Sequence, residues 1–70
     1  MRTKDGYDIY EGMVLTNVLD DDIAYKITKV HNDCVEYREF KWNEAKCDYD
    51  DTSYGGLLLA EEIEANYEYL

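Results

Sequence analysis

The chain has 70 residues, of which 46% are hydrophobic and 14% aromatic, and this length and composition predict a single small folded domain over residues 1–70. Its longest apolar run, residues 57–60, is far too short to span a membrane, and the acidic residues 1–20 lack the apolar stretch of a secretory signal, so we expect a cytoplasmic protein. Seventeen acidic and seven basic residues give a net charge of −10, which argues against direct binding to nucleic acid or to anionic membranes.

The first part of the chain predicts a strand between two irregular segments. Residues 1–6 are polar and predict a loose lead-in. Residues 13–19 are rich in β-branched side chains and predict a strand. Residues 20–22 are three consecutive aspartates, which favour a turn because their carboxylates accept hydrogen bonds from nearby backbone amides.

The clearest structural signal is a period of two in residues 23–30, which predicts a strand with one apolar face. The positions that share this face are Ile23, Tyr25 and Ile27. The polar residues 31–33 then predict a tight turn into a third strand over residues 34–42, so that the two strands form an antiparallel hairpin.

The third strand changes phase along its length. Val35 and Tyr37 have one parity, whereas Phe40 and Trp42 have the other. We therefore predict a bulge or bend near Arg38 and Glu39, which would bring the later aromatic side chains to the same inward face as Val35 and Tyr37.

The last part of the chain predicts a loop, a strand and a helix. Residues 43–53 are polar and predict a loop, and residues 54–58 predict a closing strand that bends at its two glycines. Residues 59–70 have helical spacing, with apolar residues on one face at Leu59, Ile63, Tyr67 and Leu70.

Together these elements predict a mainly β fold with four or five short strands and one C-terminal helix. The strands would form a β-barrel or a curled antiparallel sheet, and the helix would cover its open face. In strand number, turn spacing and length the chain resembles SH3-like small barrels, a resemblance that implies a fold and carries no function.

The residue types that carry catalysis or bind zinc are few. His31 and Cys34 are the one candidate pair for nucleophilic catalysis, and with Cys47 they supply three candidate zinc ligands without the paired spacing of structural zinc sites. We predict a solvated turn histidine, no catalytic residue, no metal site and no cofactor. Whether the two cysteines pair is left open by their spacing.

An acidic stretch that begins at Asp48 has oxygen ligands at the first, third and fifth positions, as in a calcium-binding EF-hand loop. The sixth position is Ser53 instead of glycine, and the twelfth is Leu59 instead of glutamate. The pattern therefore favours a solvated acidic loop over a calcium site.

Acidic residues are concentrated in two parts of the chain that contain no basic residue, residues 5–25 and 48–70. One explanation of this acidity, which involves no partner, is a charged surface that keeps the protein soluble. The functional hypothesis is a template of negative charge that binds a basic protein surface, with exposed tyrosines as flat contacts. The candidate partner-binding residues are Asp20, Asp21, Asp22, Asp48, Asp50, Asp51, Glu61, Glu64, Glu68, Tyr49, Tyr54 and Tyr69, whereas Tyr25, Tyr37 and Tyr67 are predicted to lie in the core.

In its small size, strong acidity and many tyrosines the chain is similar to the inhibitors that phages and mobile elements use against host defence, the anti-CRISPR and anti-restriction proteins. The resemblance extends over the whole composition and includes no motif, so it assigns no residue a role. It implies an inhibitor that occupies the nucleic-acid-binding cleft of its target, such as a host-defence protein, by mimicking nucleic-acid charge. The alternative function is a small barrel that acts as a protein-interaction or assembly module, with incidental acidity.

Overall fold

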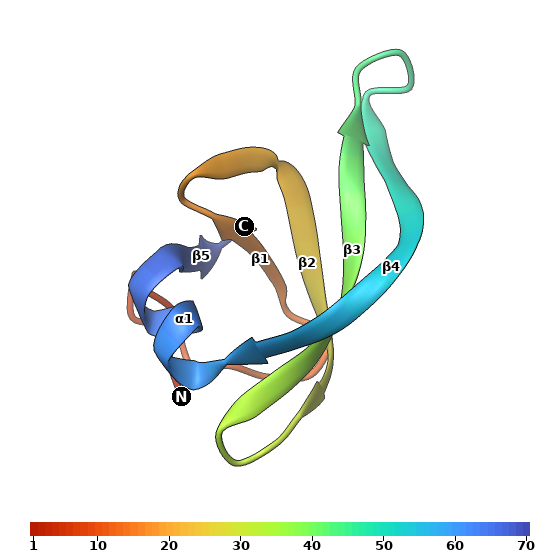
Figure 1. The fold of residues 1–70 in the computed structure, drawn as a ribbon. Helices are drawn as coiled ribbons and strands as arrows, with labels where there is room; N and C mark the ends of the chain where they lie inside the picture. Colours follow the sequence, from red (N-terminus) through yellow and green to blue (C-terminus); the bar gives the residue numbers. More distant parts are fainter.

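Five antiparallel strands form one curled sheet in the computed structural model, which describes residues 1–70 (Figure 1). The elements in chain order are β1 (Val14–Asn17), β2 (Asp20–Val30), β3 (Cys34–Asn43), β4 (Asp48–Leu59), α1 (Ala60–Asn66) and β5 (Tyr67–Tyr69). The order of strands in the sheet is β4-β3-β2-β1-β5, and α1 lies between the end of β4 and β5 (Figure 1). The prediction of a mainly β fold with a curled antiparallel sheet and a helix near the C-terminus is confirmed.

The hairpin of β2 and β3 forms as its alternating pattern predicts. Its turn is closed by a hydrogen bond from the His31 amide to the Cys34 carbonyl (2.9 Å). The apolar face of β2 pairs with that of β3, where Ile27 lies opposite Tyr37. On the other side of β3 the pairing with β4 continues beyond the body of the sheet, so that the far end of the β3–β4 hairpin projects from the molecule (Figure 1).

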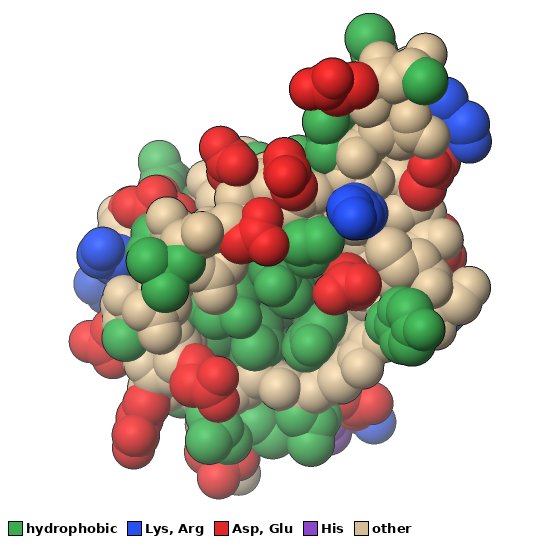
Figure 2. Space-filling model, turned by 45° about the horizontal axis from the view of Figure 1, so that its top comes forward, with side chains coloured by type: hydrophobic (Ala, Val, Ile, Leu, Met, Phe, Trp, Pro, Cys, Tyr) green, Lys and Arg blue, Asp and Glu red, His purple; other side chains and the backbone are tan.

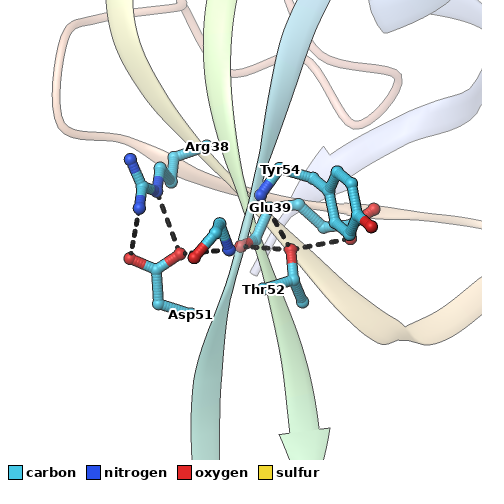
Figure 3. Close-up of polar contacts among 6 residues, drawn as sticks. Arg38, Glu39, Asp51, Thr52 and Tyr54 are labelled. Atoms are coloured by element: carbon cyan, nitrogen blue, oxygen red, sulfur yellow. Dashed lines mark hydrogen bonds and ion pairs between the residues drawn. The ribbon is translucent and has the colours of Figure 1, made fainter.

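The bulge predicted in the third strand is wrong: β3 pairs regularly with β2 from Tyr37 to Lys41, so Phe40 and Trp42 face away from the core, and the extra residues beside Arg38 belong to β4. Arg38 pairs with Gly55, whereas Phe40, two residues further, pairs with Asp51. The additional β4 residues are held by side chains: the Thr52 hydroxyl lies 2.9 Å from a carboxylate oxygen of Glu39 and 3.2 Å from its carbonyl oxygen (Figure 3).

A small apolar core fills the inside of the curled sheet. Its buried members are Met13, Leu15, Ile27, Val35, Leu58, Ile63 and Tyr67. The helix contributes Ile63, which is 0% exposed, and its first amide is tied to the β2–β3 turn by a hydrogen bond from Ala60 to the Asp33 carbonyl (2.9 Å). The helix therefore covers the open side of the sheet, as predicted. No helix of the structure has the length and apolar character needed to cross a membrane.

The predicted helix over residues 59–70 is too long, because the chain leaves helical conformation after Asn66. Residues 67–69 form β5 instead, with Glu68 opposite Thr16 of β1. Backbone pairing with β1 replaces the last helical turn, and as a result Leu59 and Leu70 are each 52% exposed rather than part of a buried stripe.

Three predicted irregular segments are ordered by contacts between distant parts of the chain. Residues 20–22 begin β2 rather than forming a turn, and the predicted loop over 43–53 shortens to residues 44–47 because β4 begins at Asp48. The lead-in is not loose: the Lys4 amide donates to the Tyr67 carbonyl (2.7 Å), and Thr3 is only 2% exposed. These segments are ordered by backbone hydrogen bonds to distant parts of the chain, and such bonds leave no pattern in the local sequence.

Gly55 marks the closest approach of β4 to β3. A Cβ atom at this position would lie 2.5 Å from the backbone carbonyl oxygen of Tyr37, whereas at Gly56 the nearest atom is the Tyr37 hydroxyl, 3.3 Å away. We expect Gly55→Ala to lower the free energy of unfolding by about 1–3 kcal/mol, because a strand backbone must shift. Gly56→Ala meets a movable side chain and is the matched control. Equal urea-unfolding midpoints for the two variants would contradict this packing.

Candidate protein-binding surface

Acidic side chains from the start of β2 and from the turn after β3 meet on one side of the sheet. A hollow of about 350 Å³ is lined by residues from the start of β2 and from the end of the β3–β4 hairpin, namely Asp21, Asp22, Trp42, Glu44 and Tyr49. They come together because β2 and β4 are both neighbours of β3 in the sheet, and because Trp42 lies opposite Tyr49. We call these five residues the acidic groove.

The three carboxylates of the acidic groove have no basic partner. Asp21, Asp22 and Glu44 form no ion pair with a lysine or arginine in the structure. The aromatic side of the groove is an edge-on ring contact between Trp42 and Tyr49, with centroids 5.2 Å apart and an interplanar angle of 71°. The groove therefore combines unneutralised negative charge with an aromatic surface.

On the face that Figure 2 shows, acidic side chains are distributed around apolar surface and do not form a single continuous patch. In the view of Figure 2, hydrophobic side chains form a central patch, and separate acidic groups lie around it. Only a few basic groups appear on this face (Figure 2). A partner that approaches it meets apolar contacts within a negative field, an arrangement that favours basic surfaces with some apolar side chains.

Two of the candidate aspartates are engaged within the protein. Both carboxylate oxygens of Asp51 are contacted by Arg38 at 2.9 Å (Figure 3), and this hydrogen bonding lowers the pKa of the Asp51 carboxyl. Asp50 accepts hydrogen bonds from Asn43 (2.8 Å) and Lys46 (2.9 Å), which lower the pKa of the Asp50 carboxyl in that order. These two residues hold the projecting hairpin together, and their charges are partly neutralised.

The three candidate glutamates near the C-terminus lie apart from the acidic groove. Glu61 lines a separate hollow beside Asp33, at the end of the sheet that carries the β2–β3 turn. Glu64 is exposed on α1, while Glu68 belongs to β5. Because the helix ends before Glu68, the three carboxylates do not continue along one helix face as the sequence pattern predicted.

The candidate tyrosines have different surroundings. Tyr54 is 71% exposed on β4 and is free for contact. Tyr49 is only half-buried, against Trp42. The Tyr69 hydroxyl lies 3.1 Å from that of Tyr10, and its ring packs edge-on against Tyr7, so this exposed cluster lies near the chain termini and away from the acidic groove.

The three tyrosines predicted to be core residues pack together at the edge of the core. Tyr25 contacts Tyr37 and Tyr67 edge-on, with centroids 5.1 Å apart in both pairs. Tyr67 is buried, and the other two are half-buried and pack against the core. Burial raises the pKa of Tyr25 to about 12, and the neighbouring Tyr67 adds to this shift.

The shift at Tyr25 predicts a loss of stability in alkali. An ordinary tyrosine has a pKa of 10.0, so between pH 10 and about 12 the unfolded chain releases a proton that the folded chain keeps. The free energy of unfolding should therefore fall as the pH rises through this range. The contribution of Tyr25 to stability should be fully present below pH 10. Urea-unfolding free energies of the wild type and Tyr25→Phe across this range test the point. Parallel pH profiles for the two proteins would contradict it.

The residues weighed for catalysis and metal binding are separated or engaged elsewhere. The His31 Nε2 atom lies 2.7 Å from a carboxylate oxygen of Glu36. Desolvation raises the pKa of the Cys34 thiol, and nearby Asp33 adds to the shift, which opposes formation of a reactive thiolate. Cys47 lies in the other hairpin turn, and both cysteines are free. They lie at opposite ends of the β3–β4 ladder, so an intramolecular disulfide is excluded.

The acidic stretch that begins at Asp48 belongs to β4 and is not a calcium-binding loop. The structure contains no group of three or more histidine, cysteine or acidic side chains placed to hold a metal ion.

Sequence patterns did not identify Trp42 and Glu44 as members of the candidate surface. Their contribution follows from the register of the β3–β4 hairpin, which extends to the pair Asn43 and Asp48. The parity change at Phe40 was the available signal, since it turns Trp42 to the face opposite the core. Comparison of the chain with protein-family models, with curated proteins and with solved structures found no match.

Proposed function

We propose that this protein is a non-enzymatic binding protein that occupies a basic, nucleic-acid-binding cleft of a partner protein and so inhibits it by charge mimicry. The observation that carries the proposal is the acidic groove, in which carboxylates from distant parts of the chain gather beside two aromatic rings and lack basic partners. A basic cleft that binds phosphate groups would contact, in the acidic groove, a negatively charged surface with flat aromatic rings.

The distribution of charge supports this proposal. Only three of the seventeen acidic side chains, Asp8, Asp50 and Asp51, form ion pairs with a lysine or arginine. The rest of the negative charge remains available to attract a basic partner at a distance. Glu61, Glu64 and Glu68 lie outside the acidic groove and add to this field, and we assign them steering rather than direct contact with the cleft.

A protein-interaction module is the second candidate, and one observation favours it. Strand β4 is an edge of the sheet and exposes apolar side chains, with Leu57 62% and Leu59 52% exposed. An extended partner segment can pair with such an edge through backbone hydrogen bonds. In that case the acidity is incidental, and binding depends little on charge.

A competition experiment tests the proposed function. The chain is used to capture proteins from a nuclease-treated lysate of its source organism, and the captured partner is purified and bound to a labelled oligonucleotide. Added chain should displace the oligonucleotide, and excess oligonucleotide should release the chain, because both occupy one cleft. A partner that binds chain and oligonucleotide simultaneously would contradict the proposal.

A further inference from the structure

Next to the acidic groove lies a second hollow that is mainly apolar. It has a volume of about 280 Å³, and its lining residues are Val14, Ala24, Lys26, Phe40, Asp48 and Tyr49. Tyr49 lines both hollows, so the two are adjacent and share a wall. Their floor is the face of the sheet opposite the core, where Ala24 lies beside Phe40 in the pairing of β2 with β3.

The two hollows differ in charge, and this difference determines which of them accepts a cationic side chain. The apolar hollow has one basic and one acidic side chain, Lys26 and Asp48, neither of which forms an ion pair, so it has no net charge to attract a cation. At the other end, the three unpaired carboxylates of the acidic groove surround Trp42, which is 37% exposed. An indole beside carboxylates is a favourable site for a guanidinium or ammonium group, because the negative face of the ring and the carboxylates both attract the cation.

We propose that the two hollows together bind a short segment of the partner protein in which a bulky apolar residue is next to an arginine or lysine. The apolar side chain occupies the hollow at Phe40, and the cationic side chain lies over Trp42 among the carboxylates. This inference rests on the proposed function and specifies the contact that it makes: the partner's cleft presents an apolar side chain as well as a cationic one to the two hollows. A second copy of this chain is a poor occupant, because each copy carries a charge of −10.

Blocked dipeptides are suitable probes, because they contain only the two side chains in question. Acetyl-Leu-Arg-amide is titrated into isotope-labelled protein, and amide chemical shifts and the fluorescence of Trp42, the only tryptophan, are recorded. We expect binding with a Kd of about 1 mM and shifts confined to the residues of the two hollows. Acetyl-Leu-citrulline-amide has nearly the same shape without the charge and should bind at least about fivefold more weakly. Acetyl-Gly-Arg-amide lacks the apolar group and should bind about tenfold more weakly.

Variants of the protein give a second test. Replacing Asp22 and Glu44 by Asn and Gln should remove most of the preference for arginine over citrulline. Glu11→Gln removes an exposed charge from a turn outside both hollows and is the control. Equal affinity for arginine and citrulline dipeptides, or shifts centred on α1 and the β4 edge, would overturn the inference. Shifts of the hollow residues with protein concentration alone would identify a second copy as the occupant and would also overturn it.

The probe experiment and the competition experiment can fail independently. If the arginine dipeptide binds as described but the chain does not displace nucleic acid from its partner, the groove assignment stands and charge mimicry is wrong. If displacement occurs while the dipeptides do not bind, the proposed function stands and this inference is wrong.

Discussion

Ile63→Ala should lower the free energy of unfolding by about 2–5 kcal/mol, the cost of deleting a fully buried aliphatic side chain. Ile63 is 0% exposed and is the residue through which α1 joins the core. Small domains have limited stability, and in a chain of this size each kcal/mol corresponds to about 4–8 °C in the melting temperature. We expect the variant to melt far below the wild type or to be unfolded at room temperature.

Leu59→Ala is the control for this prediction. Helical spacing places Leu59 and Ile63 on one stripe, whereas in the structure Leu59 is 52% exposed. Its replacement should therefore change the free energy of unfolding by roughly 0.5 kcal/mol or less, the usual effect at a surface site. Thermal melts of the two variants distinguish a helix that buries both residues from the observed helix, which buries Ile63 alone. Similar losses for both would mean that Leu59 is also buried.

Binding to the partner should weaken strongly when the acidic groove loses its charge. Each exposed ion pair contributes about 0.2–1 kcal/mol, so replacing Asp21, Asp22 and Glu44 by their amides should weaken binding by about 3- to 100-fold. The loss should be greatest at low salt, because the Debye length falls from about 10 Å at 0.1 M to about 3 Å at 1 M salt. Partner affinity measured by calorimetry against salt concentration checks both expectations.

The matched control removes three negative charges from α1 and β5 instead. Glu61, Glu64 and Glu68, replaced by glutamine, change the net charge equally but lie outside the acidic groove. We expect a slower association rate and a much smaller loss of affinity, because these groups act only at a distance. Equal losses of affinity for the two triple variants would show that net charge, and not the groove, determines binding.

The parts of the fold that the sequence predicts are those with a local signal. The hairpin around residues 31–33 follows from alternation in residues 23–30, whereas the change of parity between Tyr37 and Phe40 reflects a regular β3 whose later aromatic side chains face away from the core. The first part of β4 has no such signal, because residues 48–53 are acidic and their backbone is held by β3 and by Arg38 and Thr52 side chains.

The candidate surface was predictable only in part, because contacts between distant strands leave no local signal in the sequence. The sequence singles out the aspartates at the start of β2 as an acidic segment, but their neighbours depend on the register of a hairpin whose second strand begins where the sequence predicts a loop. The prediction of an uninterrupted helix over residues 59–70 failed because β5 pairs with β1, an interaction between residues about fifty positions apart in the chain.

A structure of the complex with the purified partner tests the central claim most directly. The proposal predicts that the acidic groove faces the partner's nucleic-acid-binding cleft, with arginine or lysine nitrogens within about 4 Å of the carboxylates of Asp21, Asp22 or Glu44. An interface formed instead by the β4 edge, with Leu57 and Leu59 buried and the acidic groove open to solvent, would contradict charge mimicry and identify the protein as an interaction module.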